Sequence, residues 1–394
     1  MTDRKAGIRR KPGNRLMIIL LIVAVFFSMI GRTIFSPVMP YLQEELAISL
    51  ATVGTLFLLS SISYSLVMVY SGYLTAWIGH GNTVVAALVM ITVGMVISAG
   101  AGNALMLAAG MICIGAGGGT YAPSGIAMVN SRISIEKRST AFSFHEVGSN
   151  SAVLLAPIIV LAAVPLLGWR GVLLLLASLA AVTSVIFYVF GAADSGVGAK
   201  PNLNTIGTIL RLPNTYVAML VFSTSLTGLH GVYSILPAYL VEHSTWSPEH
   251  VNSLVTLSRV ISISILLLAG PIIKMMGRRN TIMVILLFTG VLTGLISVAQ
   301  GRMLELVVVL QPALIAAMFP AQLSCLADIG ETRYLNVTSA LVITVGMIFG
   351  AGVVPALVGV LGDLGVGWLG FVALALIMFL AVAVLMLNPS FGKR

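Results

Sequence analysis

Apolar segments follow one another along the chain, separated by short polar turns. Each is at least about as long as the ~20 residues that span the hydrocarbon core of a bilayer as an α-helix. This pattern predicts an all-α polytopic membrane protein with 12 transmembrane helices. The predicted segments are residues 16–40, 50–75, 83–101, 104–129, 139–164, 169–191, 213–241, 250–274, 281–300, 304–328, 334–361 and 367–388.

The longest polar connection lies between the sixth and seventh segments and divides the chain into two halves. We expect a basic cytoplasmic N-terminus (1–15), a six-helix bundle (16–191), a cytoplasmic linker (192–212), a second six-helix bundle (213–388) and a cytoplasmic tail (389–394). The halves share a Gly-x6-Gly-x2-Asn pattern, 198 residues apart, at the end of the second helix of each. Weak internal repeats of this kind are typical of secondary transporters.

Composition and charge agree with a membrane protein and limit its partners. The 394-residue chain is 58% hydrophobic and 8% charged, whereas soluble domains carry about 25% charged residues. The net charge of +9 does not indicate nucleic acid, because most of the 21 Lys and Arg residues fall on one side of the predicted topology. This positive-inside asymmetry places both termini in the cytoplasm. We expect a multi-pass protein of the cytoplasmic (inner) membrane of a bacterium, surrounded by lipid.

The paired loop patterns and the central linker resemble the major facilitator superfamily over nearly the whole chain. That family carries a glycine-rich basic loop after its second helix and, more weakly, after its eighth. The resemblance implies two pseudo-symmetric six-helix bundles that rock around a central site, with these loops in gating. Ala76 and Lys274 stand where the family has an acid. The matching residues are Gly72, Gly79, Gly270, Gly277, Arg278 and Arg279.

Two arginines lie inside apolar segments, where a charge is costly unless it faces protein or water. Arg32 shares one helical face with Ser28 and Ser36, at i, i+4 and i+8. Arg32 and Arg259 both lie about 12 Å below the predicted outer edge, and His230 joins this layer. Because arginine binds a carboxylate or sulfonate through two parallel hydrogen bonds, this layer predicts an anion site. The alternatives are snorkelling or carbonyl contacts for the arginines and a neighbouring hydroxyl for the histidine.

The eighth-segment arginine also resembles the substrate-binding arginine of monocarboxylate transporters and of oxalate/formate exchange in the same superfamily. Further cavity residues follow from helix position, although aromatic residues in spans more often serve packing. The complete set of predicted substrate-binding residues is Arg32, Arg259, His230, Ser36, Tyr64, Tyr121, Tyr233 and Gln322.

Glu146 is the only carboxylate that the pattern places well within a span, and His145 precedes it. Burial favours the protonated form of a carboxyl group, so Glu146 is a candidate proton carrier and His145 a group that shares the proton. The alternative is a gating contact of Glu146 with Lys137, Arg138 or a loop backbone.

These observations predict a secondary active transporter, not an enzyme, that moves a small organic anion by alternating access. We expect proton coupling, no cofactor besides the proton gradient, and a monomer. The first alternative is a multidrug/proton antiporter that exports lipophilic compounds. The second, from another class, is a non-transporting membrane receptor or scaffold that keeps the fold. The sequence shows no metal cluster, no paired acids and no nucleophile beside a base, which disfavours an intramembrane enzyme.

Overall fold

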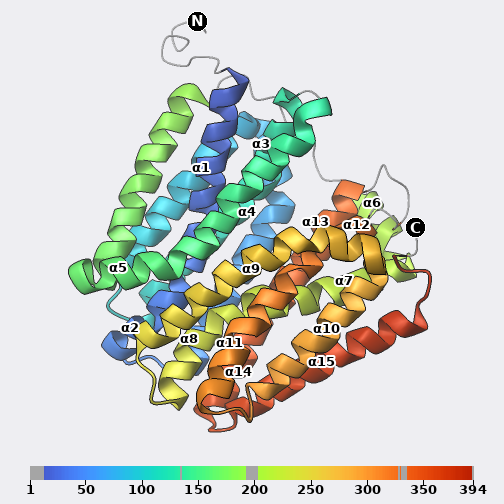
Figure 1. Ribbon diagram of the computed structural model, residues 1–394. Coiled ribbons are helices and arrows are strands. Elements are labelled where there is room, and N and C mark those ends of the chain that lie inside the picture. The colour runs from blue at the N-terminus through green and yellow to red at the C-terminus, as the bar shows by residue number, and fades with distance from the viewer. Residues whose placement is uncertain (1–12, 134, 192–202, 327–328, 330–334, 393–394) are drawn as a thin grey trace, which may run out of the picture. The chain divides into compact units, whose positions relative to one another are not determined.

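The computed structural model describes residues 13–133, 135–191, 203–326, 329 and 335–392. The regular elements of these ranges are helices (Figure 1). Most of the predicted N-terminal segment, the first part of the predicted linker (192–202) and the last two residues of the predicted tail lie outside the described residues. The side chains of Lys137 and Arg138, the alternative contacts of Glu146, also lie outside them.

The chain forms two compact units. Unit 1 comprises Met1–Val38 and Leu59–Pro201, and unit 2 comprises Met39–Leu58 and Asn202–Arg394. The segment Met39–Leu58 therefore packs with the second half of the chain, although the first half surrounds it in sequence.

Unit 1 is built on long helices. α1 (Asn14–Thr33) packs along α5 (Ile135–Phe190) and against α4 (Ala104–Arg132) (Figure 1). α3 (Leu50–Ala99), whose first residues belong to unit 2, and α5 each consist of two helices joined at a glycine with positive φ, 78° at Gly79 and 65° at Gly168. Only glycine adopts such a conformation without steric cost, so these two positions break the long helices.

Within the described residues, ten helices are long and apolar enough to cross a membrane. The helices that contain Gly79 and Gly168 each cover two predicted segments. The chain is thus an all-helical, multi-pass protein, while the number of 12 crossings and the side on which the termini lie stay predictions.

Unit 2 contains shorter helices around a shared apolar core. α10 (Arg278–Leu295) packs beside α15 (Gly367–Leu387), and α9 (Pro248–Met276) packs beside α11 (Gly301–Ala316) (Figure 1). Phe222 belongs to this core, with its ring 6.4 Å from that of Phe319 in an edge-on contact. The helices from residue 203 onward are α6 (Leu203–Leu210), which lies within the predicted linker, α7 (Pro213–Leu226), α8 (Val232–His243), α9 (Pro248–Met276), α10 (Arg278–Leu295), α11 (Gly301–Ala316), α12 (Met318–Leu326), α13 (Leu335–Ile348), α14 (Val354–Asp363) and α15 (Gly367–Leu387).

The two loop patterns of the sequence adopt the same local structure. Gly277, which separates α9 from α10, has φ of 78°, the value found at Gly79. Four residues later, the hydroxyl of Thr83 donates to the carbonyl of Gly79 at 2.8 Å, and that of Thr281 donates to the carbonyl of Gly277 at 2.8 Å. The 198-residue spacing is therefore a structural repeat as well as a sequence pattern.

The first and the seventh predicted segments differ from the helices in the structure. The first predicted segment ended at residue 40, but α2 (Phe35–Leu46) continues the chain through Glu44 and Glu45. The reason is that Glu and Gln are good helix formers, so their polarity does not end the helix. The seventh predicted segment contains a π-helical turn, η1 (Thr227–Gly231), between α7 and α8.

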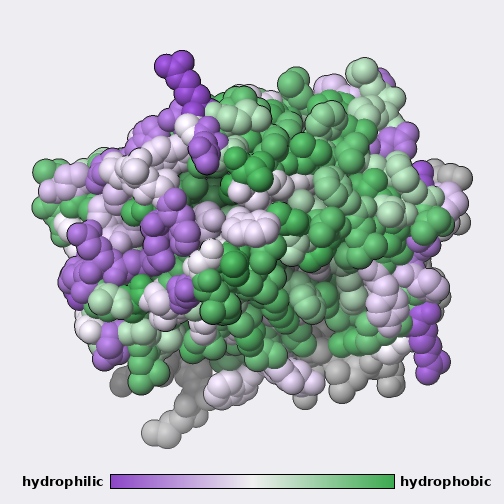
Figure 2. Space-filling model, turned by 90° about the horizontal axis from the view of Figure 1, so that it is seen from below, coloured by the Kyte–Doolittle hydropathy of each residue, from purple (hydrophilic) through white to green (hydrophobic). Residues whose placement is uncertain are grey.

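Large apolar side chains cover much of the protein surface. Figure 2 shows one face on which hydrophobic residues form a broad continuous area. Leu166, Leu267 and Leu376 are 82%, 77% and 61% exposed. Apolar patches of this size are rare on soluble monomers and mark contact with lipid or another apolar partner, which agrees with a protein embedded in a bilayer.

Candidate functional site

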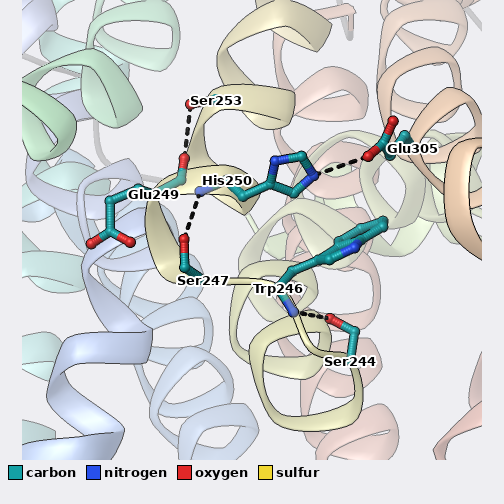
Figure 3. Close-up of polar contacts among 7 residues, drawn as sticks. All are labelled: Ser244, Trp246, Ser247, Glu249, His250, Ser253 and Glu305. Carbon is teal, nitrogen blue, oxygen red and sulfur yellow. Dashed lines mark hydrogen bonds and ion pairs between the residues drawn. The ribbon is translucent and has the colours of Figure 1, made fainter.

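The helix that carries Arg259 is fixed at its start by polar contacts. The hydroxyl of Ser247 accepts a hydrogen bond from the backbone N–H of His250 at 3.3 Å and caps α9. The His250 Nε2 lies 3.1 Å from Glu305 Oε1 on α11, and the ring of Trp246 packs edge-on against the imidazole (Figure 3). These contacts set the position of α9 against α11 at the end of α9 that precedes Arg259.

Arg259 lies on the face of an aromatic ring. Its guanidinium carbon is 4.2 Å from the ring centroid of Tyr233 on α8, and both residues are 3% exposed. A cation stacked on an aromatic face gains electrostatic stabilisation that increases as water is removed. The contact fixes the plane of the guanidinium group, so the direction of its N–H bonds is set before any ligand arrives.

One edge of the Arg259 guanidinium has no hydrogen-bond partner among the described residues. Nε and Nη2 are both buried and unpaired, and no carboxylate among the described residues forms an ion pair with this side chain. Leaving a buried charged donor unsatisfied costs at least about 1–3 kcal/mol. Nε and Nη2 form the side edge of the guanidinium group, whose N–H groups donate two parallel hydrogen bonds to the two oxygens of one carboxylate. The geometry therefore suits an anion with two oxygens in one plane.

A distorted segment of helix carries His230. η1 interrupts the α-helical hydrogen bonding at Thr227–Gly231, and a second π-helical turn, η3 (Phe349–Val353), packs against it. A Cβ at Gly231 would strike the carbonyl oxygen of Gly350, so glycine is required for this close approach. Turns of this kind occur mostly as single-turn bulges inside α-helices and are frequent at functional sites.

The sequence pattern did not single out Gln311, a fully buried amide on α11. Its Nε2 donates to the hydroxyl of Thr293 at 3.2 Å, and its Oε1 is buried without a partner. A Cβ at Gly228 in η1 would lie 3.4 Å from the Gln311 Nε2, so the amide sits beside the π-helical turn. The sequence feature that could have identified Gln311 is its polar amide within a largely apolar segment.

Gln322, a predicted substrate-binding residue, is engaged within unit 2. Its Nε2 donates to the hydroxyl of Ser225 on α7 at 3.1 Å, and its Oε1 is buried without a partner. The structure therefore places Gln322 between α12 and α7, with one acceptor unused.

Unit 1 contains a second arginine–tyrosine pair. The guanidinium carbon of Arg32 lies 4.3 Å from the ring centroid of Tyr64 on α3. Gly118 on α4 makes room for the pair, because a Cβ there would lie 3.1 Å from the Tyr64 ring and 3.3 Å from Arg32 Cδ. Ser36, predicted on the same face as Arg32, is 1% exposed.

The repeat relates the two halves at this level as well. Arg32 and His230 are 198 residues apart, the spacing that separates Gly79 from Gly277. Each half therefore places a basic side chain at the same position of its repeat, an arginine in unit 1 and a histidine in unit 2.

The predicted proton-coupling residues meet a predicted substrate residue in unit 1. His145 Nε2 is 2.8 Å from the hydroxyl of Tyr121, and the two rings are stacked with 4° between their planes. His145 Nδ1 lies 3.7 Å from Glu146 Oε1. The His145 side chain is 7% exposed and that of Glu146 is 60% exposed. The expected burial of Glu146 is therefore wrong, because its side chain points to the protein surface and the neighbouring imidazole is the buried group.

The basic residues of the second loop contact the ends of helices. Arg278 Nη1 donates to the carbonyl of Ser324 at 2.9 Å near the end of α12. Arg279 Nη2 donates to the carbonyl of Leu385 at 2.6 Å in the last turn of α15. Cations stabilise the negative C-terminal ends of helices. Within unit 2 these side chains hold helix ends in place; their role in gating stays a prediction, as does that of Gly72 and Gly270.

Comparison with known proteins identifies the family. The sequence model of one protein family, the Major Facilitator Superfamily, matches residues 21–329 of the chain. The chain belongs to this superfamily, whose members are membrane transporters and not enzymes.

A curated relative and several solved structures are similar to the chain. The hexuronate transporter of Escherichia coli (strain K12) is 24% identical over 176 residues, which cover 44% of this chain and 40% of that protein, so the match spans less than half of either. A bacterial homologue of the human lysosomal transporter Spinster, solved in an inward-facing and unoccupied conformation, aligns with a TM-score of 0.81 and 13% identity over 98% of both chains. The nucleoside transporter NupG aligns with a TM-score of 0.74 and 12% identity over 94% of this chain and 98% of that one. These structural likenesses establish the fold.

Proposed function

We propose that the chain is a secondary transporter for small organic anions that carry a carboxylate. The single observation that supports this proposal most is the buried, unpaired Nε–Nη2 edge of Arg259, held in place by Tyr233. An uncompensated guanidinium in a membrane protein is costly. A carboxylate substrate supplies the missing charge and both missing acceptors.

The curated relative and two buried amides of unit 2 narrow the chemical class of the proposed substrate. A hexuronate is a sugar acid with one carboxylate and several hydroxyl groups, and the hexuronate transporter resembles this chain in part of its length. In unit 2, Gln311 and Gln322 each keep a buried amide oxygen without a partner. Amide oxygens accept hydrogen bonds from hydroxyl groups, so the proposed substrate class is a hydroxylated monocarboxylate.

Uptake of an anion into a cell with an inside-negative potential needs a second ion. The membrane potential opposes entry by about 2.3 kcal/mol per charge at 100 mV, and a co-transported proton removes this penalty. We assign the coupling to Glu146 and His145 and the transport cycle to alternating access, in a monomer in the inner membrane of a bacterium. Arg32, stacked on Tyr64 in unit 1, is assigned to the same anionic substrate.

The two alternative functions make different demands on these residues. A multidrug/proton antiporter for cationic compounds needs an acid in its pocket, whereas no carboxylate among the described residues pairs with Arg259 or Arg32. A receptor or scaffold with the same fold predicts binding without flux.

The experiment that tests the proposal is uptake of radiolabelled sugar acids by purified protein in liposomes. Wild type and Arg259→Ala are compared with Arg302→Ala, an exposed arginine outside the site. We expect saturable uptake that Arg259→Ala abolishes and Arg302→Ala preserves. Binding without uptake supports the scaffold, and uptake or export of lipophilic cations alone supports the drug antiporter.

A further inference from the structure

The pairing of Tyr121 and His145 decides where the imidazole carries its hydrogen. Both side chains are buried, and the two residues are 2% and 5% exposed, so water does not compete freely for their polar atoms. The Tyr121 hydroxyl has two neighbours, the backbone carbonyl oxygen of Leu21 on α1 at 3.0 Å and His145 Nε2 at 2.8 Å. All of these groups belong to unit 1.

The carbonyl oxygen of Leu21 only accepts hydrogen bonds, whereas a phenol has a single hydrogen to donate. Tyr121 therefore donates to Leu21 and has only lone pairs left for His145. The contact at 2.8 Å requires that Nε2 of His145 carries the hydrogen. In a neutral imidazole, the other nitrogen is then an unprotonated acceptor. The network thus selects one of the two tautomers and leaves Nδ1 bare.

The bare Nδ1 adjoins a carboxyl group that reaches the surface. Nδ1 is buried and has no hydrogen-bond partner among the described residues, and Glu146 Oε1 lies 3.7 Å away. On α5, the exposed polar residues Ser143, Glu146 and Asn150 lie on one face at i, i+3 and i+7, which they share with the exposed Val147. The carboxyl group of Glu146 is therefore accessible at the protein surface. The titratable groups placed against His145 are Glu146 from its own helix and Tyr121 from α4, while α1 offers the Leu21 carbonyl.

We propose that Nδ1 of His145 is the atom that binds the coupled proton, with Glu146 as its exchange group to water and Tyr121 as its positioning residue. This inference rests on the proposed proton-coupled function and names the atoms that perform it. A proton passes from the carboxylic acid of Glu146 to Nδ1, which leaves a carboxylate beside an imidazolium. The Nε2–H continues to donate to Tyr121, so the proton binds without disturbing the buried network. Release follows the same path in reverse.

The first test is nitrogen-15 NMR of histidine-labelled protein in lipid nanodiscs, which needs no substrate. The chain contains five histidines, and His145→Gln identifies the His145 signals by difference. At high pH we expect a single Nε2–H tautomer with Nδ1 bare. Tyr121→Phe removes the acceptor and yields a mixture of tautomers. Gly125→Ala, whose Cβ would lie 2.9 Å from the Tyr121 hydroxyl, yields the same mixture without removing the phenol.

Further arms separate a proton-binding site from a structural contact. Glu146→Gln keeps the tautomer but slows exchange of the Nδ1 proton with water. His80→Gln serves as the matched control, because His80 is the other unit 1 histidine and contacts Ser124. We expect His80→Gln to change neither the tautomer of His145 nor the exchange rate of its Nδ1 proton. An Nδ1–H tautomer in the wild type, or an unchanged single tautomer in Tyr121→Phe, overturns the inference.

A transport arm distinguishes failure of this inference from failure of the proposed function. We expect that a proton gradient stimulates uptake in the wild type and in His80→Gln but not in His145→Gln. If Arg259→Ala abolishes uptake but a proton gradient does not affect uptake in the wild type, the role of His145 is overturned and the anion-transport function is retained. The protein could instead show the expected tautomer shifts, no anion uptake, and another proton-driven flux that His145→Gln abolishes. That result overturns the proposed substrate and retains Nδ1 of His145 as the proton-binding atom.

Discussion

The carboxylate of Asp363 caps the helix that begins at Leu50. Its Oδ1 accepts a hydrogen bond from the backbone N–H of Leu50 at 2.9 Å, and Oδ2 accepts from the N–H of Ala51 at 3.2 Å. Asp363 is the last residue of α14 and Leu50 the first of α3, so the contact joins segments far apart in sequence within unit 2. The first N–H groups of a helix have no partner within the helix, and an anion there is stabilised by the helix dipole.

Two further hydrogen bonds attach Met39–Leu58 to the second half of the chain. The hydroxyl of Tyr41 donates to Glu249 Oε1 at 3.0 Å, and Gln43 Nε2 donates to Glu242 Oε2 at 3.1 Å.

Removal of the Asp363 carboxylate is expected to destabilise the cap. Asp363→Ala leaves two helix N–H groups without their acceptors and lowers the free energy of unfolding by about 1 kcal/mol. Asp363→Asn keeps one acceptor and has a smaller effect. Denaturant unfolding in detergent measures both, and an Asp363→Ala variant as stable as wild type shows that the cap contributes nothing.

A matched pair of glycine substitutions tests the contact between the π-helical turns. Gly231→Ala forces a Cβ onto the Gly350 carbonyl and is expected to lower the melting temperature by several degrees, because overpacking costs about 1–3 kcal/mol. Gly270 lies within α9, and a Cβ added there would meet no atom within 4 Å. Gly270→Ala is therefore expected to leave stability unchanged or raise it by about 0.5–1 kcal/mol. Equal effects of the two substitutions contradict this packing.

The stacking of Arg259 on Tyr233 is tested by changing the ring. Tyr233→Phe keeps the aromatic face, so substrate affinity is expected to fall by less than about threefold. Tyr233→Leu removes the face and costs about 1–2 kcal/mol, which is roughly a five- to thirtyfold loss of affinity. Affinities from equilibrium binding distinguish the two outcomes; if Leu and Phe behave alike, the ring does not orient the guanidinium.

The Arg279 contact with α15 makes a stability prediction. Arg279→Ala leaves the carbonyl of Leu385 without this donor and removes a cation from the negative end of the helix, which costs about 1 kcal/mol. Arg302→Ala is the control, since Arg302 is exposed in the first turn of α11. Thermal unfolding compares them, and identical melting temperatures argue that Arg279 has no such structural role.

Much of the fold was accessible from hydrophobic pattern alone. Long apolar segments and the repeated glycine pattern predicted an all-helical membrane protein with an internal repeat, because bilayer thickness fixes helix length and only glycine tolerates the φ of 78° at Gly79 and Gly277. Helix ends were less accessible. Polarity at Glu44 and Glu45 suggested an end to the first span, but polarity does not end a helix.

The sequence identified which residues belong to the candidate site but not which of them contact one another. Arg32 and Arg259 were identified because charges are rare in apolar helices. Their stacking on Tyr64 and Tyr233 depends on helix rotation and on side-chain conformation, which sequence spacing does not determine. The same holds for His145, which the sequence joined to Glu146 as a neighbour and the structure joins to Tyr121 across two helices.

The most direct test of a carboxylate site at Arg259 is the affinity of one carboxylate and its amide, measured by calorimetry on wild type, Arg259→Lys and Arg259→Ala. The pair consists of a sugar acid that the wild type takes up and the corresponding amide, which keeps shape and hydroxyl groups but lacks the charge. We expect the wild type to bind the acid more tightly than the amide. Arg259→Ala is expected to lose at least about 2 kcal/mol of the binding free energy for the acid, which is roughly a thirtyfold loss of affinity. Arg259→Lys is expected to recover only part of this affinity, because lysine lacks the bidentate edge. Equal affinity for acid and amide in the wild type, or full affinity in Arg259→Ala, contradicts the carboxylate site.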